Sequence, residues 1–595
     1  MDSEIDRPVP GTPSNQTWGS DVIAEVLRDL DIPYVALNPG ASYRGLHDSL
    51  VNHLGNRQPR MLLCLHEEHA VAIAHGWAKV TGRPMAAILH SNVGLMHGTM
   101  AIFNAWCDRL PVIVLGATGP VDAALRRPWI DWIHTARDQG ALVRPYTKWD
   151  DQPASAAAAQ EALARAYQIA CTAPRGPVYI NLDASLQEQA LTAPPPRWPV
   201  ERSAPPPTPA PSQDAIEQAA ALLADAKRPL MFVGRVSRDR AAWQRRVELA
   251  ERLGALVATD IKTAAAFPTD HPLHAIGPTT FLNADDAKLV AGADVILSLD
   301  AVDLAGALRT AYAGAPVTAK VIRVSLDQHS HNGWSMDHQG LPPTDVYLLT
   351  EPDAAVPALL AALRARGATP AEPPPLPARA SRPPLAALDT AEAIDVPLLA
   401  TALAAAIGST DVSILRVPLS WAPQLWHFRD PLDYLGSDGG GGIGGGPGIA
   451  IGCALALRDS GRLPVALLGD GDFAMGSTAL WTAAHYKIPL LIVVANNRSF
   501  FNDELHQERM ARQRDRPVAN RWIGQAIREP DLDLAGLARA QGCVGIGPIE
   551  DPRKLVAALQ EGAAAVRAGR PCVVDVRVRA GYDPNTAAAV TRGPR

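Results

Sequence analysis

Residues 465–500 read VALLGDGDFAMGSTALWTAAHYKIPLLIVVANNRSF. One apolar run in this stretch ends in Gly-Asp-Gly-Asp at 469–472, and a second ends in Asn496 and Asn497. The segment between the two runs has the length of one βαβ crossover, so both polar ends are expected at the same edge of a parallel sheet. The pattern therefore predicts an α/β fold whose chemistry lies at the carboxyl ends of the strands.

The glycines of this motif and the start of the helix after it suit an anion, because they allow close backbone approach and supply unpaired N–H groups. Asp470 would repel that anion unless a cation lies between them. Mg2+ binds carboxylate, amide and backbone oxygens together with phosphate oxygens. We therefore expect Asp470, the side chain of Asn497 and the carbonyl of Ser499 to be ligands of Mg2+. The alternative is a turn in which Asp472 is the helix N-cap and the asparagines simply end a strand.

Two proline-rich stretches, at 193–212 and 369–384, divide the chain. Such stretches are too rigid and too poor in N–H donors to lie inside packed elements. Within each of the three segments, short apolar runs alternate with alanine-rich helical stretches, which is typical of parallel sheets covered by helices on both faces. The predicted fold class is α/β, with three doubly wound parallel-sheet domains at 15–192, 213–368 and 385–590.

The short apolar runs are predicted to be buried strands. They lie at 34–38, 61–66, 85–91 and 112–117 in the first segment, 230–234, 294–300 and 320–325 in the middle segment, and 465–469, 489–495 and 572–578 in the third. No short repeat period is visible, which excludes a solenoid.

The composition of the chain argues against disorder, nucleic-acid binding and membrane insertion. The 595 residues are 47% apolar, with 55 Lys and Arg against 61 Asp and Glu and a net charge of -6, so neither disorder nor a positive field for nucleic acid is indicated. No apolar run reaches the roughly 18 residues of a membrane span, and the start MDSEIDRPVPG lacks a basic region followed by an apolar stretch. Six scattered cysteines without a CxxC pair favour a reducing compartment. We expect a cytoplasmic protein that binds neither nucleic acid nor a membrane.

The stretch MLLCLHEEHAVAIAHGWAKVTGRPMAAILHSNVG at 61–94 places Glu67 between a predicted strand and a small-residue helix. A carboxyl group at the apolar end of a sheet would be partly desolvated, which suits proton exchange. Glu68 is the competing residue, but the strand register favours Glu67. Two alternatives remain: Glu67 caps the helix, or His66 and His69 bind zinc, although they stand three apart without HExxH spacing and without partner ligands.

The spacing of GDG and NN is the known signature of enzymes that use thiamin diphosphate, and the chain resembles that superfamily along nearly its whole length. The glycine run GSDGGGGIGGGPGIAIGCALA at 436–456 also fits, and Ile443 matches the bulky apolar residue that holds the cofactor bent in this family. A flexible loop or another nucleotide cradle is the alternative, whereas a Walker A loop is excluded because no Gly-Lys-Ser/Thr follows. The implied domain order is that of acetolactate synthase, pyruvate oxidase and benzoylformate decarboxylase: pyrimidine-binding, central and diphosphate-binding.

The resemblance implies thiamin diphosphate and Mg2+ as cofactors and a small 2-oxo acid as substrate. The substrate would form an adduct at C2 of the cofactor and lose CO2, which leaves an enamine. The enamine would then be protonated to release an aldehyde or, in carboligation, passed to an aldehyde or ketone acceptor. The implied site residues are Glu67 and His90 (catalytic); Gly40, Ile443, Gly469, Gly471, Asp472 and Asn497 (cofactor-binding); and Asp470, Asn497 and Ser499 (metal).

Some stretches look most like benzoylformate decarboxylase, and others depart from it. The similar stretches are ILHSNVG at 88–94, FNAWCDRLP at 103–111 and ALWTAAHYKIP at 479–489. His90 falls at that enzyme's active-site histidine, with a merely structural strand-end histidine as the alternative. Ala41 stands where that enzyme has a substrate-binding serine, and the adjacent Ser42 could substitute. The second active-site histidine of that enzyme has no counterpart at 298–308, and the paired histidines of pyruvate decarboxylase are missing from LGATGPVD at 115–122.

The middle segment lacks GxGxxG, so FAD is not indicated.

The resemblance implies that Glu67 and Asp470 of one site come from different subunits, which makes a homodimer the minimum assembly and a homotetramer the usual one. Residues 498–532 suit either a lid over the site or an exposed surface helix, with Phe500, Phe501 and Trp522 as candidate substrate neighbours. Competing functions are acetolactate-like synthesis, hydrolytic C–C cleavage of a diketone, and cofactor binding without catalysis; a proton-relay glutamate argues against the last.

Overall fold

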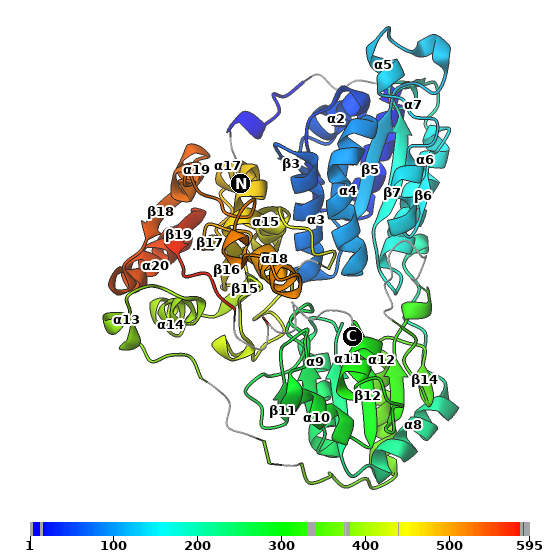
Figure 1. Ribbon diagram of the computed structural model, residues 1–595. Coiled ribbons are helices and arrows are strands. Elements are labelled where there is room, and N and C mark those ends of the chain that lie inside the picture. Colours follow the sequence, from blue (N-terminus) through cyan, green and yellow to red (C-terminus); the bar gives the residue numbers. More distant parts are fainter. Residues whose placement is uncertain are drawn as a thin grey trace.

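The computed structural model describes residues 4–11, 16–329, 340–373, 375–376, 381–437, 439–582 and 587. The predicted outer domain boundaries, 15 and 590, and part of the second proline-rich stretch lie outside these residues. Figure 1 shows three α/β units, with the first (blue to cyan) beside the third (yellow to red) and the central unit (green) below them in this view. None of the helices in the described part combines the length and the apolar composition that crossing a bilayer requires.

The first unit contains a parallel sheet of strand order β3-β2-β4-β5-β7-β6. Its strands are β2 (Tyr34–Leu37), β3 (Arg60–Leu63), β4 (Ala86–Leu89), β5 (Ile113–Thr118), β6 (Asp150–Asp151) and β7 (Val178–Asp183), with a separate antiparallel pair, β1 (Thr17–Trp18) and β8 (Ala190–Leu191). Its helices are α1 (Gly19–Asp29), α2 (Arg44–Asp48), α3 (Glu67–Thr81), α4 (Ser91–Cys107), α5 (Ile130–Ile133), α6 (Ala156–Cys171) and α7 (Ala184–Gln187). Every residue of β4 and β5 is buried, as expected for strands covered on both faces.

The central unit has strand order β11-β10-β9-β12-β13-β14. Its strands are β9 (Pro229–Val233), β10 (Leu256–Thr259), β11 (His274–Ile276), β12 (Val295–Leu299), β13 (Lys320–Val324) and β14 (Val346–Leu348). Its helices are α8 (Gln213–Asp225), α9 (Arg240–Leu253), α10 (Ala284–Gly292), α11 (Leu304–Ala311) and α12 (Pro352–Ala365). The strand order reverses beside β9, the place where open α/β sheets usually bind ligands.

The third unit has strand order β15-β16-β17-β19-β18. Its strands are β15 (Val412–Arg416), β16 (Leu463–Gly469), β17 (Leu491–Asn496), β18 (Val544–Ile549) and β19 (Cys572–Arg577). Its helices are α13 (Ala387–Thr390), α14 (Val396–Ile407), α15 (Gly446–Ala456), α16 (Asp470–Gly476), α17 (Leu480–His485), α18 (Phe501–Gln513), α19 (Leu534–Ala540) and α20 (Pro552–Arg567).

The prediction of three parallel α/β sheets is confirmed, and every apolar run predicted as a strand is one. The strand ends differ by a few residues: the strand predicted to continue to His66 ends at Leu63. After β16, the helix begins at Asp470 with Gly469 as its extended N-cap. The alternative in which Asp472 caps that helix is therefore wrong.

The first and third units share one hydrophobic core, because α3 packs directly on α15. The backbones of the two helices approach so closely that only glycine fits at the contact. A Cβ on Gly76 would lie 2.1 Å from the carbonyl oxygen of Ile449, and a Cβ on Gly452 would lie 2.0 Å from that of Ile73. This α3–α15 contact fixes the position of Glu67, the first residue of α3, relative to the third unit.

Candidate active site

The ends of β16 and β17 bring the predicted metal ligands together. Asp470 opens α16 and is 3% exposed. The backbone N–H of Ser499 donates both to Oδ2 of Asp470, over 3.0 Å, and to Oδ1 of Asn497, over 2.9 Å. All three predicted ligands therefore lie at one edge of the third sheet, as the βαβ spacing required.

The carboxyl group of Asp470 is buried in the third unit. Burial raises its pKa to about 6, although nearby backbone N–H groups oppose the rise. In the part of the chain that the structure describes, no Lys, Arg or His side chain forms an ion pair with Asp470. A buried carboxylate of this kind is normally compensated by a bound cation. Oδ1 of Asn497, which shares the N–H of Ser499 with Asp470, supplies a second oxygen, and this pair of oxygens fits Mg2+.

Asp472, the second aspartate of the motif, differs from Asp470 because its carboxylate forms both hydrogen bonds and an ion pair within the protein. Its Oδ1 accepts the backbone N–H groups of Gly444, over 2.7 Å, and Gly446, over 3.3 Å, while Oδ2 forms an ion pair with Arg416 at 3.0 Å. The Asp472 side chain thus anchors the glycine run to α16. Ile443, the predicted cofactor support, precedes the anchored residues and is 44% exposed.

The glycines at the start of α16 leave room for a ligand or for an aromatic ring. Gly469 has no neighbouring atom within 4 Å of a hypothetical Cβ, whereas a Cβ on Gly471 would lie 2.4 Å from the ring of Phe500. Phe500 therefore lies directly over the predicted diphosphate site. Phe501 instead packs edge-on against Tyr582, with ring centroids 5.6 Å apart.

The sequence analysis did not identify Asp575, the residue that holds the side chain of Asn496. The side chain of Asn496 donates to buried Asp575 on β19 over 2.8 Å and accepts the N–H of Arg498 over 3.1 Å. Burial raises the pKa of Asp575. Asn496 thus shapes the turn, and the Oδ1 of Asn497 is left at the edge of the site with Asp470.

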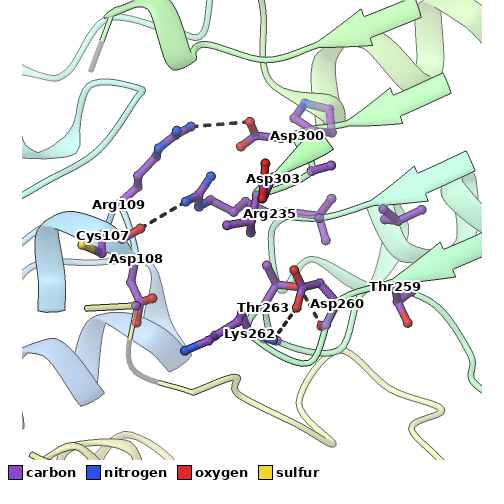
Figure 2. Close-up of a pocket in the computed structure, with 18 of the residues that line it drawn as sticks. Cys107, Asp108, Arg109, Arg235, Thr259, Asp260, Lys262, Thr263, Asp300 and Asp303 are labelled. Carbon is purple, nitrogen blue, oxygen red and sulfur yellow. Dashed lines mark hydrogen bonds and ion pairs between the residues drawn. The ribbon is translucent and has the colours of Figure 1, made fainter. Parts of the chain in front are cut away.

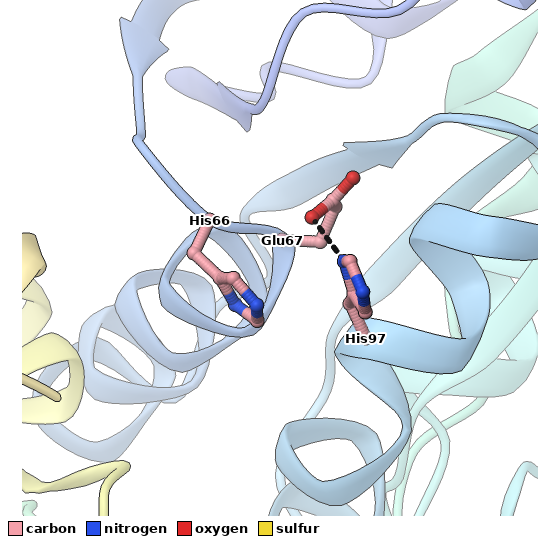
Figure 3. A group of neighbouring side chains, drawn as sticks. All are labelled: His66, Glu67 and His97. Atoms are coloured by element: carbon pink, nitrogen blue, oxygen red, sulfur yellow. Dashed lines mark hydrogen bonds and ion pairs between the residues drawn. The ribbon is translucent and has the colours of Figure 1, made fainter. Parts of the chain in front are cut away.

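Glu67 is the first residue of α3, and its side chain is 8% exposed. It does not cap the helix: the N-cap is His66, whose side chain accepts the N–H of Glu68 over 3.2 Å. Oε2 of Glu67 lies 3.0 Å from Nδ1 of His97 on α4. Figure 3 shows the Glu67 side chain pointing away from the third-unit segments seen in yellow at the left of the view.

Glu68, the competing residue, faces a different environment. Burial raises the pKa of Glu68, and the negative charge of Asp472 in the third unit raises it further. Glu68 thus lies on the side of α3 that faces the diphosphate motif of its own chain, whereas Glu67 lies beside His97. The two neighbouring carboxyl groups are therefore clearly distinguished by structure.

His90, at the end of β4, belongs to a small polar cluster. Its Nδ1 lies 2.8 Å from Oγ of Ser42, and that Oγ also accepts the backbone N–H of Ser91 over 3.1 Å. The Ser42 hydroxyl can therefore donate to Nδ1, which favours a neutral His90 with its proton on Nε2. Gly40 is required here, because a Cβ would lie 2.3 Å from the His90 ring.

A second histidine touches His90, and the sequence analysis did not find it. The ring of His134 meets that of His90 edge-on, with centroids 4.8 Å apart. Burial lowers the pKa of His90, and His134 lowers it further. Of the two residues predicted to contact substrate in the first unit, Ser42 is buried against His90 and Ala41 is exposed.

The structure brings together a group of possible zinc ligands that the sequence spacing did not indicate. Donor atoms of His66, Glu67 and His97 all lie within 4.8 Å of one another. His97 comes from the second turn of α4, so only the strand order and the crossover path bring it to Glu67. His69 is not part of this group; its Nε2 lies 2.7 Å from Oγ1 of Thr478 in the third unit.

The charged stretch at 498–532 is ordered around α18. After this helix the chain returns, and Ala526 pairs with Ser499 in an isolated antiparallel bridge. Arg521 forms an ion pair with Glu508 on α18. Much of the returning segment is exposed, including Trp522 at 53%.

A separate cavity of about 1300 Å3 lies where the three units meet, and Figure 2 shows part of its lining. Charged groups of both signs line it: Lys79, Asp108, Arg109, Arg235, Asp260 and Asp300. Arg109 is paired with Asp300 at 3.4 Å, and Arg235 donates to the carbonyl of Cys107 over 3.2 Å. Because Lys79 and Glu67 lie near opposite ends of α3, they are about 18 Å apart along the helix axis. The cavity is therefore distinct from the Glu67 site.

Three family models match the chain in order. They describe the thiamine pyrophosphate enzyme N-terminal TPP binding domain at residues 17–142, the central domain at 216–334 and the C-terminal TPP binding domain at 418–576. Together they cover more than half of the sequence.

Curated relatives align over most of their own length. "Probable 2-ketoarginine decarboxylase AruI" of Pseudomonas aeruginosa is 28% identical, over 90% of each chain. Benzoylformate decarboxylase of the same organism is 26% identical, over 87% of this chain and 91% of the relative. Acetolactate synthase isozyme 1 large subunit of Escherichia coli is 26% identical, over 81% and 82%.

Solved structures share the fold at lower identity. Benzoylformate decarboxylase from Polynucleobacter necessarius matches with a TM-score of 0.76 and 20% identity, over 95% of this chain and 99% of that one. A 4-hydroxybenzoylformate decarboxylase from Rhodococcus jostii matches with a TM-score of 0.74 and 22% identity, over 95% and 100%.

Proposed function

The chain belongs to the family of thiamine pyrophosphate enzymes, and we propose that it uses thiamin diphosphate and Mg2+ to decarboxylate a small 2-oxo acid. The remaining fragment leaves as an aldehyde or is joined to an aldehyde or ketone by carboligation. One observation carries the proposal: the buried carboxylate of Asp470, beside Asn497 and Ser499, forms no ion pair with any of the residues that the structure describes. The decarboxylase names of two relatives support the 2-oxo acid.

Residues of the third unit would hold the charged end of the coenzyme. Asp470, the side-chain oxygen of Asn497 and the carbonyl oxygen of Ser499 would bind Mg2+. The backbone at the start of α16, beside Gly469 and Gly471, would receive the diphosphate. Asp472 would act by anchoring the glycine run that carries Ile443, and Ile443 would support the coenzyme between its two rings.

Residues of the first unit would handle protons. When bound, thiamin diphosphate supplies an electron sink for the charge that remains as CO2 leaves. Glu67 would share a proton with the nitrogen of the pyrimidine ring, and Gly40 would allow that end of the coenzyme to approach. His90 would donate its Nε2 proton to the reacting fragment, with Ser42 holding the ring in that tautomer.

The substrate end and the assembly are part of the same proposal. Ser42, through the hydroxyl that also contacts His90, would contact the substrate, with Phe500 shaping the pocket from the third unit and Phe501 packed against Tyr582. Figure 3 shows the side chain of Glu67 pointing away from the third-unit segments drawn there, and Asp470 of a second subunit would complete the site. A homodimer is then the minimum active assembly and a homotetramer the expected one, built from domains at 15–192, 213–368 and 385–590.

A second candidate reaction is acetolactate-like synthesis, which the similarity to acetolactate synthase favours. It differs only in the acceptor, since a second 2-oxo acid takes the fragment left by the first. Hydrolytic cleavage of a diketone and cofactor binding without catalysis remain the more distant candidates.

The decisive experiment gives the Mg2+-loaded holoenzyme pyruvate, benzoylformate, 2-ketoarginine and longer 2-oxo acids, separately and with an aldehyde acceptor. CO2 and products are measured by mass spectrometry. We expect CO2 from at least one substrate and at least a hundredfold less from Glu67→Gln, about the rate contribution of a positioned proton-transfer group. CO2 release by Glu67→Gln at the wild-type rate would refute the catalytic assignment, and no turnover of any substrate would leave cofactor binding alone.

A further inference from the structure

Residues of α4 determine the position of the Glu67 carboxyl group. Its Oε2 lies 3.0 Å from Nδ1 of His97, and its Oε1 faces Gly94, where a Cβ would be only 3.0 Å away (Figure 3). Gly94 and His97 lie one turn apart on α4, so a single helix face contacts both oxygens. The rotamer of Glu67 is therefore set by α4 and not by α3, the helix that carries it.

His97 is itself fixed by a second ring. It stacks on His66, with centroids 4.8 Å apart and an interplanar angle of 21°. His66 is the N-cap of α3, and its Nδ1 accepts the backbone N–H of Glu68 over 3.2 Å. The backbone of α3 thus orients His66, His66 supports the His97 ring, and His97 reaches Glu67.

The hydrogen-bond chemistry assigns a proton to His97. An ionised carboxylate only accepts hydrogen bonds, so Nδ1 of His97 must carry the hydrogen when Glu67 is charged. The remaining nitrogen, Nε2, then needs no proton, and the His97 side chain is 57% exposed. One oxygen of Glu67 is occupied by this bond, and the other stays available to a ligand.

We propose that His97 is a positioning residue: its Nδ1–H engages Oε2 of Glu67 and so presents Oε1 to the pyrimidine nitrogen of the coenzyme. This inference rests on the proposed function and adds to it a residue in the first unit that acts through Glu67. A hydrogen bond to a charged group contributes enough that its loss should slow a Glu67-dependent step by roughly ten- to a hundredfold.

Three substitutions separate the hydrogen bond from the bulk of the ring. The amide nitrogen of Asn falls close to the position of Nδ1, that of Gln falls close to Nε2, and Phe keeps a stacking ring without any donor. All proteins are treated with chelator and reloaded with Mg2+ and thiamin diphosphate, which keeps transition metals away from His66, Glu67 and His97. NMR then follows exchange of the coenzyme's C2 proton for deuterium without substrate, and calorimetry measures coenzyme affinity.

We expect His97→Asn to exchange within about threefold of wild type, and His97→Gln and His97→Phe to exchange at least about tenfold more slowly, toward the level of Glu67→Gln. Thermal unfolding of the cofactor-free variants should change little, because His97 is mostly exposed. Wild-type exchange in His97→Phe, or equally slow exchange in the Asn and Phe variants, would overturn the inference. If the wild-type protein binds no thiamin diphosphate, the proposed function itself fails, and calorimetry separates that outcome from the others.

Discussion

The backbone N–H of Ser499 donates to Oδ2 of Asp470 over 3.0 Å, which joins the ends of β16 and β17 at the predicted metal site. Yet the folded protein still holds this carboxyl group at a cost, since burial raises its pKa from 3.8 to about 6. The charged form is therefore less favourable in the folded than in the unfolded chain. That cost is absent below about pH 4 and complete well above pH 6.

Asp470→Asn should consequently change the pH dependence of stability. Between pH 4 and pH 8, the unfolding free energy of the metal-free variant should rise relative to metal-free wild type by up to about 3 kcal/mol, the equivalent of about two pKa units. Chemical denaturation at both pH values measures the difference. An unchanged difference would mean that Asp470 is solvated in the folded protein.

The affinity for Mg2+ should depend on pH, because protons and Mg2+ compete for the carboxyl group of Asp470. Because Mg2+ needs the ionised carboxylate, its affinity in the presence of thiamin diphosphate should fall as the pH decreases through about 6. Calorimetric titration at pH 5 to 8 tests this, with Asp470→Asn as the control that binds weakly throughout. Constant Mg2+ affinity over this range would place the metal away from Asp470.

Gly452→Ala should destabilise the protein strongly. The new methyl group would lie 2.0 Å from the carbonyl oxygen of Ile73, and backbone on both sides prevents relief. We expect a loss of about 2 to 4 kcal/mol in unfolding free energy. Gly292→Ala is the matched control, because its Cβ meets nothing within 4 Å. Equal stability of the two variants would show that the α3–α15 contact can separate at little cost.

His134→Asn should raise the pKa of His90. The shift follows because His134 is one of the influences that lower this pKa, after burial. NMR titration of histidine-labelled protein measures it, with His53→Asn as a control at an exposed histidine that contacts Glu25. An unchanged His90 titration would mean that the two rings do not contact each other in solution.

Mixing two inactive proteins should restore activity if the site is shared between subunits. In a heterodimer of Glu67→Gln and Asp470→Asn chains, one site carries both changes and the other carries neither. Random reassociation yields half heterodimers, so about a quarter of wild-type activity is expected. Activity is assayed after the mixture is dissociated and refolded together, and each variant alone is the control. No recovery would place Glu67 and Asp470 of one site in the same chain.

The sequence was sufficient for the sheets and for the motif at their edge. Apolar strands and βαβ spacing are local properties, so the strands of all three units and the proximity of Asp470 to Asn497 could be predicted. The extended backbone of Gly469 is not visible in the sequence, which therefore allows Asp472 as the N-cap of the following helix.

The side-chain partners in the first unit could not be predicted. His97 reaches Glu67 only because α4 crosses beside the start of α3, and His134 reaches His90 from the end of α5. No spacing rule singles out these two among the 16 histidines of the chain. Asp575 likewise lies far along the chain from Asn496, on the adjacent strand.

The α3–α15 contact can form only late during synthesis on the ribosome, because its two helices lie far apart in the sequence. Gly452 leaves the ribosome 376 residues after Gly76, a delay of about 20 to 75 seconds at ordinary elongation rates. During that interval α3 has an apolar face with no partner, and chaperones would have to shield it. Truncated genes that encode only the first unit should therefore yield aggregates. The central unit, which keeps most of its core to itself although Trp243 and Ala265 pack with the third unit, could be produced alone.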